Sequence, residues 1–420
     1  METGHFRQSM SLLLTRRFGT FWFASLLANI GTWAQQMAQP WLMLSLGASP
    51  FLLGLDSFAS GAPVLLLTLV GGALADQADR RRTIALFQSI QMLCPVLLVV
   101  LIVTGQVSPW MVIVMSLIVG ITDALSMPSF QSIVPSIVPP AQIPTGIALN
   151  STQFNLSRIL GPAIAGVLMA SVGMAGAFAV SALSYVPFIL VALWVLPPLP
   201  AAKGRRVALN HRQLWASVGE VAREPQLRGG LLTVLTTALL CAPLITFCPI
   251  LVKDVFQGRA GDFSLALGAF GVGGLLGASG LLAVDPLSDR RTLSARFALA
   301  YAGVVVLAAV NPWSIGLVGL LLCAGVTMTV SNASANAVLQ SCAPAHLRGQ
   351  AASMFMLAMR GGMSLGSLLT GVTVHAWGVR EALVLNGLVA LLLHLLVGRQ
   401  WVRAPLLTPN RGDQSKACKP

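Results

Sequence analysis

The sequence contains few charged residues, and acidic ones are the scarcest. Only 9% of the 420 residues are charged, with 13 Asp and Glu against 26 Lys and Arg, whereas 55% are hydrophobic. A soluble domain has roughly a quarter charged residues. The composition therefore excludes a soluble globular protein and indicates a chain that lies largely within a lipid bilayer.

Residues that mark common enzyme and metal sites are also few. None of the four lysines follows a glycine, which excludes a P-loop and an intrinsic ATPase. The five histidines show no metal-binding spacing, and the six cysteines form no CxxC pair. We therefore predict no cofactor and no metal site, and we interpret the cysteines as small apolar residues rather than disulfide partners.

Apolar runs of about 20 residues, the length that crosses a bilayer core, recur along the chain. Gly and Pro within these runs are compatible with membrane helices, because neighbouring helices can satisfy the freed backbone groups. The runs predict an all-α membrane protein with twelve transmembrane helices. We place them near 18–46, 51–75, 83–104, 109–129, 146–171, 175–196, 229–252, 263–284, 293–310, 312–338, 347–375 and 380–399.

The basic residues lie almost entirely on one side of the predicted membrane. If the spans alternate, one side holds 21 Lys and Arg and the other holds three, with Arg158 and Arg360 inside spans. The positive-inside rule then places both termini in the cytoplasm. The net charge of +13 thus reflects topology, and we expect no nucleic-acid partner.

A long hydrophilic stretch divides the chain nearly in half. We predict an N-terminal six-helix bundle at 1–196 and a cytoplasmic linker at 197–228 that contains an interfacial amphipathic helix. A C-terminal six-helix bundle at 229–400 and a cytoplasmic tail at 401–420 follow.

The two halves also resemble each other. "DRRRT" at 79–83 and "DRRTL" at 289–293 occupy equivalent loops, and "PAQIPTGIALN" at 140–150 matches "PAHLRGQAASM" at 344–354. Repeats of six plus six spans are typical of transporters, whose substrate sites lie between the halves. We therefore expect two pseudo-symmetric bundles around a small-molecule substrate.

The loop "GGALADQADRRRT" at 71–83 joins the second and third spans. Gly71 and Gly72 allow close helix approach, and Asp76 can cap a helix and pair with the arginines that follow. A basic turn that serves topology alone is the alternative. The spacing of Gly72, Asp76 and Arg80 resembles the loop motif of the major facilitator superfamily. That resemblance implies a gating charge network that tethers the halves in one conformational state, with a degraded second copy at 281–291.

Arg158 lies within the apolar stretch "LSRILGPAIAG" at 156–166. An arginine at the centre of a span costs roughly 2.5–3.5 kcal/mol, so it should face the bundle interior or a wet cavity. Gly161 and Pro162 resemble the fifth-span motif of major facilitator exporters, which implies a gating role. The alternative is a packing motif whose arginine reaches toward the cytoplasm.

Two acidic residues are candidates for proton coupling. Asp123, in "VGITDALSMP", should lie toward the cytoplasmic end of its predicted span and is the most obvious partner of Arg158. Burial disfavours a carboxylate whereas a nearby cation favours it, and this competition could make Asp123 a proton site. Asp56, near the outer start of the second span, is the other candidate, or it is only an interfacial residue.

The first span is unusually polar, with Asn29, Trp33 and Gln36 on one helical face. Polar groups within a bilayer need partners or a water-filled cavity, so this face either lines a central cavity or makes helix–helix hydrogen bonds. Asn332 and Asn336 in the tenth span and Arg360 in the eleventh could supply the opposite wall of such a cavity.

The first half resembles one branch of the major facilitator superfamily in particular. The segments "FGTFWFASLLANIGTWAQQMAQPWLMLSLGASP", "GGALADQADRRR" and "GIALNSTQFNLSRILGPAIAG" are similar to transmembrane secretion effectors, the group of enterobactin exporters and macrolide efflux transporters. The resemblance implies a monomeric, proton-driven exporter of small organic molecules in the bacterial inner membrane. It favours siderophores slightly over drugs or macrolides.

Other classes of function fit the sequence less well. A membrane-embedded enzyme such as a lipid transferase would need an acid, base or nucleophile constellation near the interface, and we find none. A receptor or scaffold has little need of polar faces that point inward from both halves. Uptake or lipid transport by the same fold remains the next alternative.

Substitutions at the two mid-span charges test this interpretation. We expect Asp123→Asn or Arg158→Ala to abolish coupled transport while membrane insertion stays intact, because each removes an intramembrane charge. Transport assays on membranes with matched expression provide the measurement. Wild-type efflux by both variants would remove these residues from the mechanism, and a packing role predicts poor expression instead.

Overall fold

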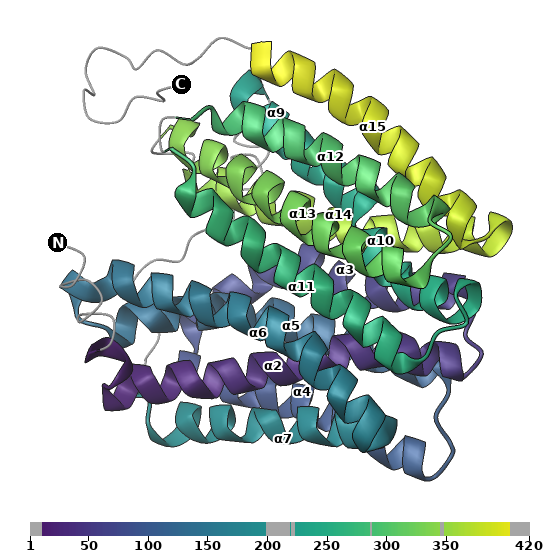
Figure 1. The fold of residues 1–420 in the computed structure, drawn as a ribbon. Helices are drawn as coiled ribbons and strands as arrows, with labels where there is room; N and C mark the ends of the chain where they lie inside the picture. The colour runs from purple at the N-terminus through teal and green to yellow at the C-terminus, as the bar shows by residue number, and fades with distance from the viewer. Residues whose placement is uncertain (1–10, 199–218, 220–222, 286–287, 345–347, 404–420) are drawn as a thin grey trace, which may run out of the picture. The chain divides into compact units, whose positions relative to one another are not determined.

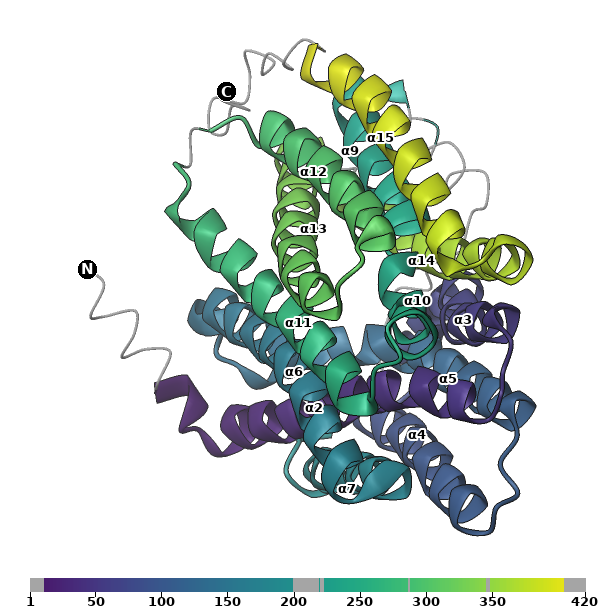
Figure 2. The same cartoon turned by 45° about the vertical axis from the view of Figure 1, so that its right-hand side comes forward.

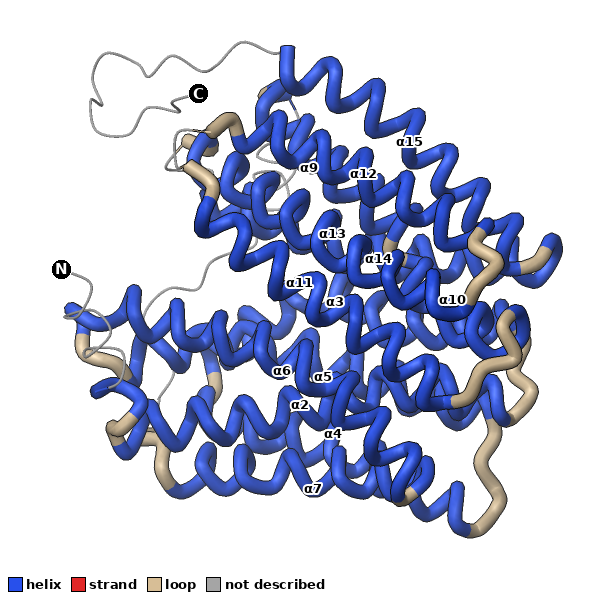
Figure 3. The backbone as a smooth tube through the Cα atoms, in the orientation of Figure 1, coloured by secondary structure: helices blue, strands red, loops and turns tan. Residues whose placement is uncertain are grey.

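The computed structural model describes residues 11–198, 219, 223–285, 288–344 and 348–403. In these ranges the chain is helical and contains no strand (Figures 1 and 3), which confirms the all-α prediction. The first six spans are α2 (Arg16–Ser45), α3 (Pro50–Gln77), α4 (Arg80–Val103), α5 (Pro109–Ile137), α6 (Ile143–Ser171) and α7 (Gly173–Trp194), with a 3-10 turn, η1 (Pro140–Gln142), before α6.

Six further spans follow the linker. The seventh comprises α9 (Pro225–Thr236), η2 (Thr237–Cys241), α10 (Pro243–Ile250) and η3 (Leu251–Val255), and the others are α11 (Ala260–Ala283), α12 (Arg290–Val310), α13 (Ser314–Cys342), α14 (Arg348–Trp377) and α15 (Val379–Arg403). Each predicted span therefore corresponds to a helical segment. The predicted amphipathic helix falls almost wholly outside the described residues.

Nine of the described helical segments are long and apolar enough to cross a membrane. The other three, α2, α6 and α14, have 30, 29 and 30 residues but carry polar residues near their middles, such as Gln35, Gln153 and Arg360. Since lipid offers no hydrogen-bond partners, these three helices depend on the protein around them.

Helix α5 is longer than its predicted span. It contains Pro128 and continues eight residues past position 129, through Pro135, to Ile137. Prolines within membrane helices are tolerated because local adjustments re-satisfy the backbone. Asp123, which we predicted to lie toward the cytoplasmic end of its span, is the middle residue of this 29-residue helix.

The seventh span changes its helical pitch twice. Ala242 N–H donates to the Thr237 carbonyl, five residues back, and Phe256 N–H does the same to Leu251, so η2 and η3 are π-helical. Pro243 begins α10, with one residue between it and the end of η2, and a proline has no N–H for the regular α-helical bond. Such π-turns are frequently found at functional sites.

The internal repeat is visible in the helix ends. The side chain of Asp79 accepts from the Arg81 N–H at 3.1 Å and caps α4, and that of Asp289 accepts from the Arg291 N–H at 3.0 Å and caps α12. Two aspartates in equivalent loops thus start the third helix of each half in the same way. Gly173 and Gly378, which follow α6 and α14, both have positive φ, 72° and 97°.

Compact packing divides the chain into two units. Unit 1 comprises 1–48, 59–207 and 259–268, and unit 2 comprises 49–58, 208–258 and 269–420. In unit 1, α4 packs against α5 and α7. In unit 2, α12 packs against α13 and α15 (Figure 2). The third helix of each half therefore contacts the fourth and sixth, as the repeat requires.

Each unit has its own aromatic or apolar core. In unit 1 the rings of Phe21, Phe130 and Phe188 lie 5.6–5.9 Å apart. In unit 2, Trp401 is buried among Leu227, Leu339 and Phe355, and a Cβ at Gly229 would overlap its ring. These aromatic side chains bury large areas. They hold α2, α5 and α7 together in unit 1 and pack α15 against its neighbours in unit 2.

Close helix contacts explain several glycines. A Cβ at Gly71 would overlap the backbone of α5 at Ala124, and one at Gly273 would overlap α13 at Leu322. A Cβ at Gly277, one turn later, would lie 2.8 Å from the Val326 carbonyl oxygen. The glycines of α11 thus allow tight packing on α13, as small residues do in membrane bundles.

The cysteine interpretation holds for four described residues and is wrong for one. Cys94, Cys241 and Cys248 are buried free thiols, and Cys323 is an exposed one. Cys342 is disulfide-bonded. Spacing could not identify it, because no motif surrounds this cysteine.

Exposed tryptophans mark the ends of several helices. Trp110, Trp313 and Trp377 are 60–72% exposed and lie at helix ends that the predicted topology places on the outer side. Trp194, 77% exposed, lies at a predicted inner end. Tryptophans prefer the headgroup level of a bilayer, so their positions fit twelve alternating spans.

The two aspartate caps yield a stability test. We expect Asp79→Ala and Asp289→Ala each to lower stability by about 1 kcal/mol, because each frees backbone N–H groups at a helix start. Thermal unfolding of the purified protein in detergent measures this. Asp254→Ala, at an exposed position in η3, is the control and should leave the transition in place. Unchanged transitions in both cap variants would contradict the assignment.

Candidate functional site

A cluster of polar side chains lies at mid-height in unit 1. The Nε2 of Gln91 on α4 donates to Oδ1 of Asp123 on α5 at 2.8 Å, and Nε2 of Gln88 donates to Oε1 of Gln91 at 3.0 Å. The hydroxyls of Thr32 on α2 and Tyr185 on α7 are 2.9 Å apart. We call these five residues the mid-bundle cluster.

The cluster is well removed from solvent. Gln91 is 3% exposed and Tyr185 is 2% exposed, whereas Asp123 is half-buried. Asp123 and Cys94 both lie within electrostatic range of the Tyr185 hydroxyl. A carboxylate in such a place needs hydrogen-bond donors, and the amide of Gln91 supplies one.

Gln91 was not among the residues expected from the sequence. We predicted Arg158 as the partner of Asp123, and the structure shows Gln91 in contact with it. The backbone of Arg158 lies at the middle of α6, and its side chain is outside the described residues. Glutamines three positions apart within an apolar span, at 88 and 91, were the signal in the sequence.

Helix α2 uses its polar residues in two ways. Thr32, Gln35 and Gln39 make hydrogen bonds to other helices, with Gln35 Oε1 accepting from Ser181 at 3.2 Å and Gln39 donating to Ser116 at 2.5 Å. These bonds join α2 to α7 and α5. Helix–helix bonding therefore accounts for this face.

The predicted cavity face of α2 is a different one. Asn29 and Trp33 are half-buried and Gln36 is exposed. The Trp33 ring meets that of Phe154 on α6 edge-on, with centroids 6.0 Å apart. This face is the more open side of α2 within unit 1, so its residues remain candidates for substrate contact.

Gly161 on α6 lies against this same part of α2. A Cβ at Gly161 would overlap the Trp33 Cβ and lie 3.2 Å from the Ala34 nitrogen. The glycine predicted to have a gating role is thus the contact point between α2 and α6. The side chain of Pro162 is outside the described residues.

The predicted residues of unit 2 are half-buried on two helices. On α13, Oδ1 of Asn336 accepts from Gln340 at 3.1 Å, and Oδ1 of Asn332 is buried with no hydrogen-bond partner among the described residues. Arg360 is half-buried on α14. Asp56, on the part of α3 that belongs to unit 2, is buried, with 7% of its surface exposed.

The loop motif is arranged differently from the prediction. Asp76 lies within α3, and the residue that caps α4 is Asp79, because it directly precedes the first helical residue, Arg80. The expectation that Asp76 caps the helix was therefore wrong. The side chains of Gly72 and Asp76 are outside the described residues.

Arg81, beside the predicted Arg80, connects two helix ends. Its guanidinium donates to the carbonyls of Leu193 and Leu196 at 3.3 and 3.4 Å, and it lies 3.7 Å from Asp79 Oδ2. A cation at the last carbonyls of a helix complements the helix dipole. Arg81 thus fixes the start of α4 to the end of α7.

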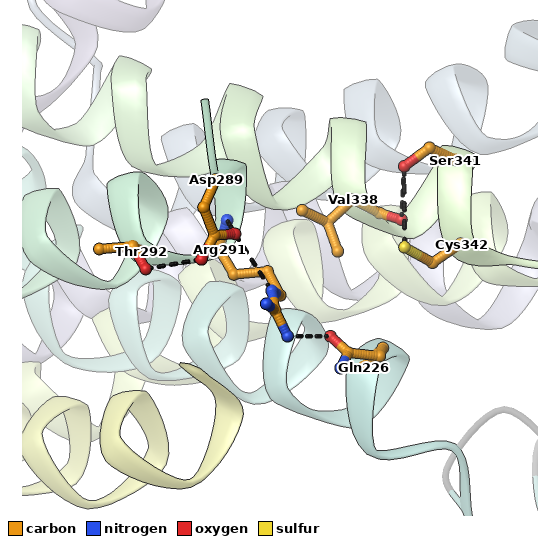
Figure 4. Close-up of polar contacts among 7 residues, drawn as sticks. All are labelled: Gln226, Asp289, Arg291, Thr292, Val338, Ser341 and Cys342. Carbon is orange, nitrogen blue, oxygen red and sulfur yellow. Dashed lines mark hydrogen bonds and ion pairs between the residues drawn. The ribbon is translucent and has the colours of Figure 1, made fainter. Parts of the chain in front are cut away.

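Unit 2 contains the corresponding arrangement around Asp289 (Figure 4). Arg291 donates to Asp289 Oδ1 at 3.1 Å and to Gln226 Oε1 at 3.2 Å, and Thr292 donates to Asp289 Oδ2 at 2.7 Å. Burial alone would raise the pKa of Asp289, but these hydrogen bonds and the Arg291 charge outweigh it and lower the pKa. The loop at 281–291, which we predicted to be a degraded copy of the motif, therefore keeps a capping aspartate, Asp289, and the arginine bound to it, Arg291.

The family of the chain follows from its similarity to known proteins. The family model described as transmembrane secretion effector matches residues 8–410. The chain belongs to this family, within the major facilitator superfamily. This secretion effector is thus a multi-pass membrane transporter of the efflux type that acts on a small molecule.

Several curated proteins resemble the secretion effector over most of their length. The staphyloferrin A transporter of Staphylococcus aureus is 26% identical over 88% of this chain and 92% of its own. The multidrug efflux pump Tap of Mycolicibacterium fortuitum is 30% identical over the same shares. The enterobactin exporter EntS of Shigella boydii is 24% identical over 86% of each.

Solved structures support the same fold. The nucleoside transporter NupG matches 93% of this chain and 100% of its own with a TM-score of 0.73 at 14% identity. A bacterial homolog of the human lysosomal transporter Spinster matches 96% and 99% with a TM-score of 0.69 at 16% identity. These likenesses establish the major facilitator fold.

One enzyme-like pattern in the sequence has a structural explanation. Residues 362–366 read Gly-Met-Ser-Leu-Gly, the spacing of a nucleophile elbow. That motif requires a sharp turn between a strand and a helix. Here the segment lies inside α14, and the Ser364 hydroxyl donates to the Arg360 carbonyl at 3.0 Å.

The contact between α2 and α6 can be tested at Gly161. We expect Gly161→Ala to destabilise the secretion effector by about 1–3 kcal/mol, because the added methyl group overlaps α2. Gly303→Ala is the matched control, since a Cβ there meets nothing within 4 Å inside α12. It should be neutral or slightly stabilising. Thermal unfolding in detergent compares the two, and equal transitions would contradict the contact.

Proposed function

We propose that this secretion effector exports small organic molecules across the bacterial inner membrane in exchange for protons, by alternating access. Siderophores are slightly favoured as substrates. The observation that carries the proposal is Asp123, a carboxylate at the midpoint of α5 that is hydrogen-bonded by Gln91. Intramembrane acids are costly and are typical of proton relays.

The proton cycle assigns roles to three residues. Asp123 takes up a proton when the site faces the outside and releases it when the site faces the cytoplasm. Arg158, at the middle of α6, favours the release because a nearby cation stabilises the carboxylate. Asp56, which is buried on α3, is the second candidate carrier.

Gating in this proposal belongs to the loop between α3 and α4 and to the glycine contact of α6. Gly72, Asp76 and Arg80 form the loop lock by their resemblance to the superfamily motif. Gly161 and Pro162 set how α6 lies against its neighbours. Support comes from the contact of Gly161 with α2, since a helix in such close contact moves together with its partner.

The substrate contacts in this proposal come from both bundles. They are Asn29, Trp33, Gln36, Asn332, Asn336 and Arg360. The buried Oδ1 of Asn332, which has no hydrogen-bond partner among the described residues, supports this assignment because buried polar atoms are usually satisfied. A hydroxylated or amide-rich ligand suits such a lining. We further propose a monomer with both termini in the cytoplasm, as the bias of basic residues indicates.

Multidrug efflux is the second candidate function. Its support is the similarity to the multidrug efflux pump Tap, which at 30% identity exceeds the 26% of the staphyloferrin A transporter. An amphiphilic drug needs fewer hydrogen bonds than a siderophore, so the open face with Trp33 would carry more of its binding energy.

Export by living cells distinguishes the candidates. We expect a deletion strain under iron starvation to retain a siderophore inside and lose it from the medium, with a protonophore giving the same pattern in the parent strain. Mass spectrometry of cells and supernatants provides the measurement. The Asp123→Asn protein serves as the matched control and should not restore export.

Two other outcomes would change the proposed substrate or the proposed proton coupling. An unchanged siderophore profile together with greater susceptibility to amphiphilic drugs would favour multidrug efflux. Export that a protonophore does not affect would refute proton coupling for either substrate.

A further inference from the structure

Two amide side chains on α4 form a directed chain toward Asp123. Gln88 and Gln91 lie one turn apart, and Nε2 of Gln88 donates to Oε1 of Gln91 at 3.0 Å. With its oxygen engaged in this way, Gln91 must present its NH₂ group to Asp123. The contact of 2.8 Å with Oδ1 is therefore a donation from the amide, and such a donation suits an ionised carboxylate.

The same chain can also run in the opposite direction. An amide carries donors at one end and an acceptor at the other, and its terminal torsion has two roughly equivalent orientations. If both amides turn over, Gln91 accepts the O–H of a protonated Asp123 and donates to the Gln88 oxygen. Each state contains one bond to Asp123 and one between the amides, so no hydrogen bond is lost.

We propose that Gln91, oriented by Gln88, is a positioning residue that matches both protonation states of Asp123 and so sets the pH at which the proton is released. This inference rests on the proposed function and extends it to α4. Because the amide pair can bind either form, Asp123 has a hydrogen-bond partner both when it is ionised and when it is protonated. A carboxyl group without a partner inside the bundle would cost free energy.

Other polar groups in this region have hydrogen-bond partners of their own. Tyr185 on α7 lies within electrostatic range of both Asp123 and Cys94. The Tyr185 hydroxyl is already engaged with Thr32, and Cys94 Sγ faces the Ile90 and Met115 carbonyls. Arg158, whose backbone lies at the middle of α6, is unchanged in every variant tested below.

Infrared titration of the full-length protein in liposomes tests the proposal. The carbonyl band of protonated Asp123 is identified as the band that Asp123→Asn removes. We expect Gln91→Leu to move the midpoint of this band upward by about one pH unit, because the charge-assisted bond that the carboxylate loses is stronger than the neutral bond that the protonated form loses. Gln88→Leu should move it in the same direction by less, and Gln91→Asn should restore part of the shift.

Asn386→Leu is the matched control for the loss of a buried amide. Asn386 on α15 donates to Thr370 Oγ1 on α14, also at 2.8 Å, in unit 2. This variant should destabilise the protein without moving the Asp123 midpoint. An equal shift in this variant would reduce the Gln91 effect to a general consequence of weaker packing and overturn the proposal.

The outcomes separate this inference from the proposed function. An unmoved midpoint in both Gln91→Leu and Gln88→Leu overturns the role of the amides, even if export is proton-coupled. Absence of any band that depends on Asp123 overturns it as well. A shifted midpoint in a protein whose export ignores a protonophore would instead leave the amide role standing and remove the proposed coupling.

Discussion

Hydrogen bonding without water is the constraint on which the rest of this structure depends. Within a bilayer each polar group must find its partner inside the protein, and the polar residues of α2 show how this is met. Thr32 pairs with Tyr185, Gln35 with Ser181 and Gln39 with Ser116. These bonds fix α2 against α7 and α5. Glycines such as Gly161 then let α6 approach the same helix closely.

The two halves share a plan but use it for different chemistry. Gln91 and Tyr301 are both the twelfth residue after an aspartate cap, on α4 and α12 respectively. Gln91 binds a carboxylate, whereas the Tyr301 hydroxyl donates to the Cys241 carbonyl in the π-turn η2 at 3.2 Å. The same position thus supports an ionisable site in one half and an irregular backbone in the other.

Neutral pairs also join helices inside unit 2. His394 lies 3.3 Å from the Thr237 hydroxyl, Asn386 binds Thr370, and the hydroxyl of Ser294 donates to the Ser331 carbonyl. Such pairs stabilise helix contacts without a net charge. The proton carrier Asp123 belongs to unit 1, so in the proposed cycle the two halves contribute unequally.

The fold could be predicted closely because it follows from the length and polarity of the segments. Twelve apolar runs gave twelve helical segments, and the repeat of "DRR" marked two equivalent helix starts. The end of α5 was missed because prolines usually stop helices in water, whereas here the helix continues to Ile137. The contact of Gln91 with Asp123 was not predicted, because the search for a partner considered formal charges such as Arg158 and not neutral amides. Hydrogen-bond partners on separate helices depend on rotation about each helix axis, which apolar periodicity fixes only coarsely.

The central position of Asp123 also has an electrical consequence. Moving one elementary charge across a membrane is worth about 2.3 kcal/mol per 100 mV. Asp123 is the middle residue of the 29 in α5, so in the proposed cycle a proton that reaches it from outside crosses about half of the field, worth about 1 kcal/mol per 100 mV. In that cycle, membrane voltage therefore acts about equally on the protonation and on the deprotonation of Asp123. Each of these two steps responds to voltage as well as to pH.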